Sequence, residues 1–308
     1  MSDTGMSIAL VGMTRWPVHG VDRAPGITLA EGGVDGLIDS PLETEWIDDT
    51  EMGSVFSGER YLPRDLTLGF FMSDELAGTP IAGRLESDFR TEFSTRPDPW
   101  DPNPQTAKVE VTSELSGTRW LSNVVLKETP ELKTERDPYT LRVYDVAYHL
   151  RAGMPLWDSG KEVTVFESAA ASDSGTITIS NPTDMPMRHT WVIAGVGATV
   201  TLPDPSWLGP KTEREPGGDF PTRTVLLPQI TADDQGVRIT RERRKLHAQT
   251  FTGSNFLVRM LGNWIRFDIP PYTPPTELPV SYTGATAGCR IECHQPRLWS
   301  RPLGLELM

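Results

Sequence analysis

The chain has 308 residues with 42 acidic and 29 basic side chains, so its formal net charge is −13. It contains no run of 18 apolar residues, which excludes a membrane-spanning helix of the usual length. Glycine and proline, 27 of each without a fixed period, are typical of a loop-rich β protein rather than of collagen or a disordered chain. The N-terminus lacks the basic segment of a signal peptide, so we expect synthesis and first assembly in a cytoplasm.

The acidic residues are concentrated in the first half of the chain. Residues 1–158 hold 27 acids and 14 bases, whereas residues 159–308 hold 15 of each. This change of charge predicts a domain boundary at about residue 159, and therefore two domains, 1–158 and 159–308. A strongly acidic first domain is not expected to hold nucleic acid through its phosphates.

The first half is predicted to be a β-sheet domain with one helix. Apolar runs and alternating patterns bounded by Gly, Pro and Asp indicate short strands. Four prolines within residues 97–104 exclude regular structure there. The expected strands are Ser7–Val11, Arg64–Phe71, Ala107–Thr112, Thr118–Lys127 and Thr140–Leu150.

The helix is expected at about residues 79–94. Thr79 followed by Pro80 is typical of an N-cap with proline at the first helical position. Apolar side chains then recur every fourth residue with charged residues between them, which predicts one buried stripe on an amphipathic helix. The stripe consists of Ile81, Leu85, Phe89 and Phe93.

The second half is predicted to be entirely β. About ten short strands separated by Pro/Gly turns favour a sandwich or a jelly roll. Within Gly175–Leu208, three strands are divided by Asn-Pro and Pro-Asp turns, and Trp191 is expected in the core. The ten expected strands are Glu162–Glu167, Thr176–Ser180, Thr190–Ala194, Ala198–Leu202, Thr224–Leu227, Gly236–Thr240, Asn255–Met260, Trp264–Ile269, Val280–Thr283 and Ala287–His294.

The sequence contains no recognisable catalytic, cofactor or metal motif. It has no G-x-S-x-G elbow, no HExxH, no phosphate-binding loop and no dinucleotide fingerprint. No histidine has a second histidine at the spacing that a metal site needs. Cys289 and Cys293 would lie about 13 Å apart on one strand, beyond disulfide reach, so we expect two reduced thiols.

Several weaker candidates remain, each with a structural alternative. Asp98, Asp101 and Asn103 have the spacing of oxygen ligands, but the intervening prolines disfavour a calcium loop. The pairs Asp48–Asp49 and Asp233–Asp234 are visible carboxylate pairs in turn-like contexts, where solvation is the simpler interpretation. The basic segment Arg241–Lys245 either holds an acidic partner or nucleic acid, or forms a hairpin with solvated charges.

Two of the nine tryptophans are candidates for stacking on a sugar ring. Trp207 and Trp299 lie near proline-flanked loops, so we expect them to be the more exposed ones. Packing or a subunit interface is the alternative use of each indole.

Eight phrases of the sequence, in this order and density, resemble the distal tail protein family of long-tailed bacteriophages. The form in question is the minor tail protein of phages that infect actinobacteria. The phrases are TRWPVHG (14–20), GLIDSPLETEW (36–46), GERYLPRDLTLGF (58–70), MPLWDSG (154–160), ISNPTDMPMRHTW (179–191), LPDPSW (202–207), IPPYTPPTELPVS (269–281) and PRLWSRPLGLE (296–306).

The resemblance implies a structural subunit of a phage tail tip and no enzymatic activity. It implies an N-terminal belt domain, a β-sandwich with one helix, that assembles into a ring expected to be a hexamer. A C-terminal galectin-like or carbohydrate-module-like sandwich would project outward. Such a ring joins the tail tube protein to the hub and baseplate, near the tape measure protein, and DNA crosses its lumen in transit. An acidic lumen would not retain passing DNA.

Two other functions stay open at this point. The second domain could be a carbohydrate-binding module that recognises host cell-wall glycan, which an exposed aromatic shelf would support. A glycan-degrading enzyme would need two convergent carboxylates in a cleft, and no pattern in the sequence points to such a pair.

Overall fold

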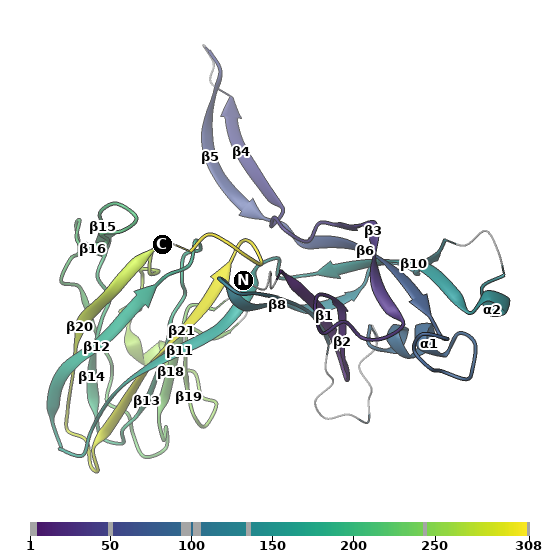
Figure 1. The fold of residues 1–308 in the computed structure, drawn as a ribbon. Coiled ribbons are helices and arrows are strands. Elements are labelled where there is room, and N and C mark those ends of the chain that lie inside the picture. The colour runs from purple at the N-terminus through teal and green to yellow at the C-terminus, as the bar shows by residue number, and fades with distance from the viewer. Residues whose placement is uncertain are drawn as a thin grey trace. The chain divides into compact units, whose positions relative to one another are not determined.

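The structure is a computed structural model that describes residues 5–48, 52–93, 100, 106–133, 137–242 and 245–306. It is mainly β and divides into two compact units (Figure 1). Unit 1 combines the chain up to Ser159 with Trp299–Leu305, and unit 2 comprises Gly160–Leu298 with the residues after Leu305. The predicted fold class, a β unit with one substantial helix followed by an all-β unit, is confirmed. The return of Trp299–Leu305 to unit 1 was not expected from the sequence.

Unit 1 is built on one antiparallel sheet in the order β2-β1-β7-β8-β10-β6-β3. Strand β8 pairs with β7 through most of its length and with β10 at its end, so it connects the two halves of the sheet. The bounds are β1 (Ser7–Val11), β2 (Arg15–His19), β3 (Ile27–Asp35), β6 (Arg64–Ser73), β7 (Ala107–Ser113), β8 (Gly117–Leu126), β9 (Glu131–Leu132), which pairs with β10, and β10 (Val143–Ala152).

The core of unit 1 is formed by alternate residues of these strands and by helix α1 (Arg84–Thr91). In β6, the buried side chains are Leu66, Leu68, Phe70 and Met72, the period of two that a sheet with one buried face requires. Leu85, Phe89 and Phe93 of the predicted stripe are buried, and the ring centroid of Phe89 lies 5.0 Å from that of Phe70 and 5.2 Å from that of Tyr148.

Helix α1 begins at Arg84, so the predicted start and the predicted N-cap at Thr79 are wrong. The N-cap residue is Gly83, whose φ of 78° is in the left-handed region, and it offers no side chain to the helix. Asp74 supplies the cap from a distance, because its buried carboxylate accepts hydrogen bonds from the N–H groups of Gly83 (2.7 Å) and Leu85 (3.0 Å). Burial raises the pKa of Asp74, but these hydrogen bonds outweigh it and lower the pKa below its usual value. Ile81 precedes the helix and is exposed.

A second short helix, α2 (Pro138–Leu141), begins the segment that was predicted to be the strand Thr140–Leu150. Asp137 caps it by accepting a hydrogen bond from the Tyr139 N–H at 3.0 Å. Arg142, with φ of 55°, ends the helix, and β10 follows at once.

The strands β4 (Leu42–Asp48) and β5 (Ser54–Tyr61) form a separate two-stranded sheet, which we call the arm. Figure 1 shows the arm extending away from the rest of unit 1. Every described side chain of β4 is exposed, as are most of those of β5. The sequence analysis predicted no strand here, since neither strand has a buried face to produce an alternating pattern.

Arg64 fixes the base of the arm to unit 1. Its side chain is fully buried, and its guanidinium donates hydrogen bonds to the carbonyl oxygens of Gly36, Leu37, Pro155 and Ser300 and to the Ser40 hydroxyl, at 2.6–3.2 Å. Burial lowers the pKa of Arg64 to about 10, so the group stays charged at neutral pH. Its donors are satisfied chiefly by backbone oxygens of three chain segments that are distant in sequence.

Unit 2 is a sandwich of two antiparallel sheets. One has the order β19-β18-β13-β21-β11 and the other the order β12-β20-β14-β17. The bounds are β11 (Trp157–Ser168), which begins in unit 1, β12 (Asp173–Asn181), β13 (Thr190–Ala194), β14 (Thr199–Pro203), β15 (Trp207–Leu208), β16 (Glu215–Pro216), β17 (Thr224–Leu226), β18 (Val237–Thr240), β19 (Ala248–Thr250), β20 (Thr273–Thr283) and β21 (Cys289–Trp299).

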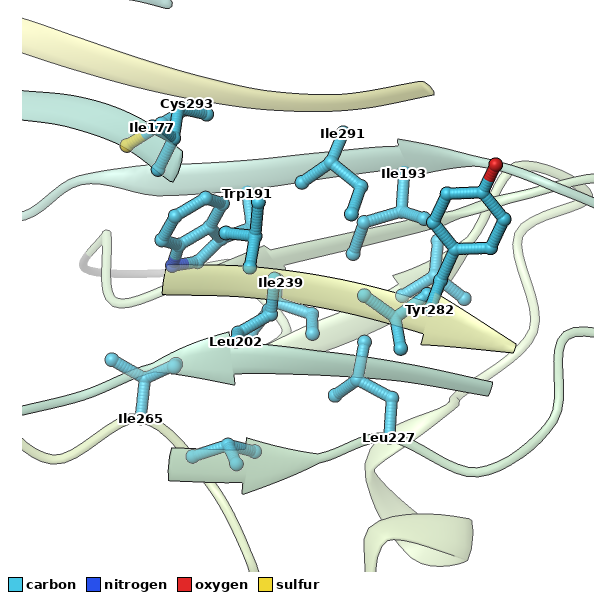
Figure 2. Close-up of a cluster of buried hydrophobic side chains, with 14 of the residues drawn as sticks. Ile177, Trp191, Ile193, Leu202, Leu227, Ile239, Ile265, Tyr282, Ile291 and Cys293 are labelled. Carbon is cyan, nitrogen blue, oxygen red and sulfur yellow. The ribbon is translucent and has the colours of Figure 1, made fainter. Parts of the chain in front are cut away.

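The core of unit 2 lies between these two sheets. Figure 2 shows Trp191 and Ile193 of β13 among side chains of the opposite sheet, such as Leu202 and Tyr282. Trp191 is fully buried, as predicted. A likeness of this sandwich to galectins in particular stays a prediction.

Two predicted strands of unit 2 are wrong. Within Asn255–Met260, residues Leu257–Met260 form a 3₁₀ helix. Trp264–Ile269 is irregular apart from one bridge between Ile269 and Met187. The buried carboxylate of Asp204 explains why Trp264–Ile269 is not a strand. It accepts hydrogen bonds from the N–H groups of both Arg266 and Phe267, whereas consecutive N–H groups of a strand point to opposite sides.

Replacing Arg64 with Met is expected to destabilise unit 1 by about 3 kcal/mol or more, because several buried oxygens lose their donors at once. Chemical denaturation of the full chain would measure this. Arg151→Met is the matched control, since Arg151 forms an exposed ion pair with Asp65 and should contribute about 1 kcal/mol or less. Equal effects of the two substitutions would contradict the role assigned to Arg64.

Candidate functional site

The described residues bring together no group of three or more His, Cys, Asp or Glu side chains that could hold a metal ion. No helix among them is long and apolar enough to cross a membrane. An open hollow of about 620 Å³ beside helix α1 is lined by Glu86, Ser87, Arg90, Thr91 and Tyr139. Glu86 and Arg90 form an ion pair there, one helical turn apart, and the hydroxyls of Ser87 and Thr91 donate to backbone carbonyl oxygens of the same helix region. The surfaces of the two units are therefore the main features to consider.

The carboxylate candidates that lie within the described residues do not converge on a common site. Asp98, Asp101, Asn103 and Asp49 lie outside the described residues, and Asp48 lies on the exposed arm. Asp234 is buried and forms an ion pair with Arg259 at 2.7 Å. This pairing, together with hydrogen bonds from Thr231, lowers the pKa of Asp234 despite the burial that raises it. Asp234 therefore has a structural role in a turn.

The predicted exposure of Trp299 is wrong. Its side chain is 6% exposed and belongs to the core of unit 1. The guanidinium of Arg119 stacks over its ring at 3.7 Å, and its indole N–H donates to the Ser159 hydroxyl at 2.9 Å. Arg119 therefore covers one face of the Trp299 ring.

Trp207 is half-buried in the short strand β15. Its ring packs against the core of unit 2, and the indole nitrogen is buried without a hydrogen-bond partner among the described residues. The structure therefore places Trp207 and Trp299 in different units. Glycan binding by either residue stays a prediction.

Three exposed tryptophans were not among the predicted sugar-binding candidates, and the most exposed of them is Trp100 in unit 1, at 88%. In unit 1, Trp46 on the arm is 58% exposed, and its ring meets that of Phe56 edge-on, with centroids 5.6 Å apart. In unit 2, Trp264 is 45% exposed. Two features of the sequence could have indicated this exposure. Charged residues surround Trp46, and Trp264 stands beside Ile265, the one residue next to it that is buried.

The pairing of β4 with β5 determines what each face of the arm carries. Trp46 is paired with Phe56, and Thr44 with Glu59. Because side chains alternate along β4, Thr44, Trp46 and Asp48 share one face, and the hydrogen bond from the Trp46 indole to the Thr44 hydroxyl agrees with this. This face presents an aromatic pair with a carboxylate toward each end.

The opposite face of the arm carries the aliphatic pair Ile47 and Val55, which are 64% and 62% exposed. Nearer the base, Glu43 and Arg60 form an exposed ion pair at 2.6 Å. Over residues 42–61 the sequence has six acidic side chains and one basic side chain, so the arm is strongly negative as well as apolar.

Unit 2 carries the opposite charge in a group that we call the arginine cluster: Arg188, Arg223, Arg241 and Arg266 with Asp204 and Asp268. Asp268 is shared by Arg188 (3.6 Å) and Arg241 (2.7 Å). Asp204 is buried, pairs with Arg223 and accepts hydrogen bonds from the N–H groups of residues 266 and 267. Four guanidinium groups thus face two carboxylates.

The positive charge of this cluster is only partly balanced. Burial lowers the pKa of Arg223, and the charge of Arg266 lowers it further, which shows that the two guanidinium groups repel each other. Arg266 is exposed and has no ion-pair partner among the described residues. Trp264 lies beside the cluster, since its carbonyl oxygen accepts a hydrogen bond from Arg223 at 3.1 Å. Arg241, from the predicted basic segment, directly follows β18 in the β18–β19 hairpin, and its side chain also belongs to this larger group.

Comparisons with known proteins agree with this two-unit architecture. No protein-family model matches the chain. Among solved structures, the Dit protein (gp 19.1) of phage SPP1, described as a paradigm of the hub adsorption apparatus in phages that infect Gram-positive bacteria, superposes with a TM-score of 0.51 at 10% identity. The match covers 95% of this chain and 99% of that one. The chain thus has the fold of a phage Dit protein.

A curated relative supports the same conclusion from the sequence. Minor tail protein Gp27 of Mycobacterium phage D29 is 24% identical over 325 residues, which cover 91% of this chain and 93% of that protein. The predicted resemblance to phage distal tail and minor tail proteins is therefore confirmed, and it extends over nearly the whole chain.

One buried group makes the stability of unit 2 sensitive to acid. His189 is 4% exposed, neither ring nitrogen has a hydrogen-bond partner among the described residues, and its ring meets Trp191 edge-on at 5.7 Å. Burial, with a smaller effect of the Arg241 charge, lowers the pKa of His189 to about 4. The ring is therefore neutral in the folded chain at neutral pH, whereas in the unfolded chain it gains a proton below about pH 6.5.

The stability of unit 2 is accordingly expected to be independent of His189 above pH 6.5 and to fall as the pH decreases from 6.5 to 4, by about 3 kcal/mol in total. Urea denaturation at several pH values would measure this slope. His189→Gln should remove the slope in this window, and His247→Gln, at an exposed position, should leave it. An unchanged slope in His189→Gln would contradict the assignment.

Proposed function

We propose that this chain is a structural subunit of a phage tail tip, located in the virion and assembled in the host cytoplasm. The main support is the relation to minor tail protein Gp27 over 91% of this chain, together with the Dit fold. In this proposal unit 1 forms a ring, expected to be hexameric, that joins the tail tube protein to the hub, near the tape measure protein. The chain acts through its surfaces and performs no catalysis.

The physical support for ring formation comes from the sheet of unit 1. Its end strands β2 and β3 each have a strand neighbour on one side only among the described residues. Unpaired strand edges and an exposed apolar arm are both surfaces that a neighbouring subunit would cover. Contacts between different surfaces of identical copies produce a closed ring when the rotation between copies closes.

The purified full chain is expected to form rings of uniform subunit number. Native mass spectrometry would give that number, and negative-stain images would show the shape. Dissociation on dilution should be concentration-dependent, as for any assembly held by non-covalent contacts. A chain that stays monomeric at tens of micromolar, in buffers from low to high salt, would contradict the proposal.

We also propose that the lumen of this ring is acidic, because unit 1 carries the excess of negative charge. Rings mixed with linear double-stranded DNA at about 50 mM salt should then show no retention of DNA in a filter-binding assay, since no phosphate contacts would form. Retention that weakens steeply with salt would indicate a basic lumen and would overturn this part of the proposal.

A further inference from the structure

The arm is a hairpin whose apolar side chains are largely exposed to solvent. A two-stranded hairpin is marginally stable in water unless a third strand or a packed face supports it. Here Trp46, Ile47, Val55 and Phe56 are all at least half exposed, and the arm has no third strand among the described residues. Its base, however, is fixed to unit 1 by the buried Arg64 and Ser40. A fixed arm with an uncovered apolar end indicates a surface that is covered by a partner.

The composition of the arm restricts what that partner is. Its aromatic face places Trp46 and Phe56 between Glu59 and Asp48. A complementary surface needs an aromatic or apolar contact flanked by cations, preferably guanidinium groups, which pair with carboxylates and also stack on rings. The rest of unit 1 is itself acidic and would repel the arm.

The arginine cluster of unit 2 has the required properties. It holds an exposed aromatic ring, Trp264, beside guanidinium groups that outnumber their carboxylates, and Arg266 is exposed without an ion-pair partner among the described residues. The aromatic pair Phe220 and Phe267, with centroids 5.9 Å apart, lies beside the same segment. Both complementary surfaces are therefore present on one chain.

We propose that the arm of one copy docks on the arginine cluster of a second copy. Glu59 and Asp48 would pair with Arg266 and its neighbours, and the Trp46–Phe56 pair would pack against Trp264. The contact joins two different surfaces, so each copy offers one arm and one cluster to its two neighbours. The inference rests on the proposed ring function, because it names a contact that connects successive subunits.

The test uses charge reversal in the full chain. The arm variant is Asp48→Arg with Glu59→Arg, and the cluster variant is Arg266→Glu. Each variant alone should associate roughly tenfold or more weakly than the wild type, because like charges then meet at the contact. An equimolar mixture of the two variants should recover association, since a reversed arm fits a reversed cluster and the native arm fits the native cluster. Analytical ultracentrifugation would measure all four samples.

Matched controls separate this contact from a general effect of charge. Glu75→Arg reverses an exposed acid of unit 1 outside the arm, and Lys161→Glu reverses an exposed base of unit 2 outside the cluster. Neither should change the association. Circular dichroism of every variant should match the wild type, since all five positions substituted in the arm, the cluster and the controls are exposed.

The possible outcomes decide between the inference and the proposed function. A wild-type chain that forms rings, with arm and cluster variants that form them equally well, would overturn the inference and leave the ring intact. Weakened variants whose mixture does not recover would show that the arm and the cluster each meet some other partner, and would also overturn it. A wild-type chain that stays monomeric would count against the proposed function itself. Recovery in the mixture alone supports the contact in trans, because a contact within one chain cannot be repaired by mixing.

Discussion

Unit 1 depends on one buried cation, Arg64, whose hydrogen bonds go mainly to backbone oxygens. Arg64 satisfies its donors with oxygens from the segment that leads into the arm, from Pro155 and from Ser300. Removing a guanidinium from water is costly, and here the cost is offset by several charge-assisted hydrogen bonds to backbone oxygens, which are themselves buried and need donors. The result is a single point at which three distant stretches of chain are held in a fixed relation. The arm can therefore be exposed along its length and still point in a defined direction.

In both units the buried charged groups support the fold, whereas other charged and aromatic groups are exposed on the surface. Asp74 caps a helix, Arg119 covers Trp299, and Asp204 organises a loop, so the buried charges have structural partners. What stays uncovered is a negative aromatic surface on unit 1 and a positive one on unit 2. Exposed surfaces that combine apolar and charged side chains are typical of contacts with other proteins. The fold of the SPP1 Dit protein and the relation to a mycobacteriophage tail protein agree with this.

The sequence predicted strands well where one face is buried, as in β6 and β13, because burial of one face imposes a period of two. It failed for β4 and β5, since both faces of the arm are exposed and no periodicity results. The helix was found from its stripe, but its start was misplaced, because the cap comes from Asp74 ten residues earlier. The arginine cluster could not be predicted, because its members come from five separated segments that only the folded sandwich brings together. Trp299 was misjudged because proline-flanked sequence indicates a loop, not whether the loop returns to a core.

The return of the chain to unit 1 has a consequence for the timing of synthesis. Unit 2 is inserted between Ser159 and Trp299, so the segment Trp299–Leu305 of unit 1 is synthesised after the whole of Gly160–Leu298. Until then Arg119 has no ring to cover, and Arg64 lacks the carbonyl of Ser300. Unit 1 thus reaches its complete form only after the segment that forms unit 2 has been synthesised. A nascent chain that has not yet reached Trp299 therefore has an unfinished first unit, although all of that unit's sheet strands have already been made.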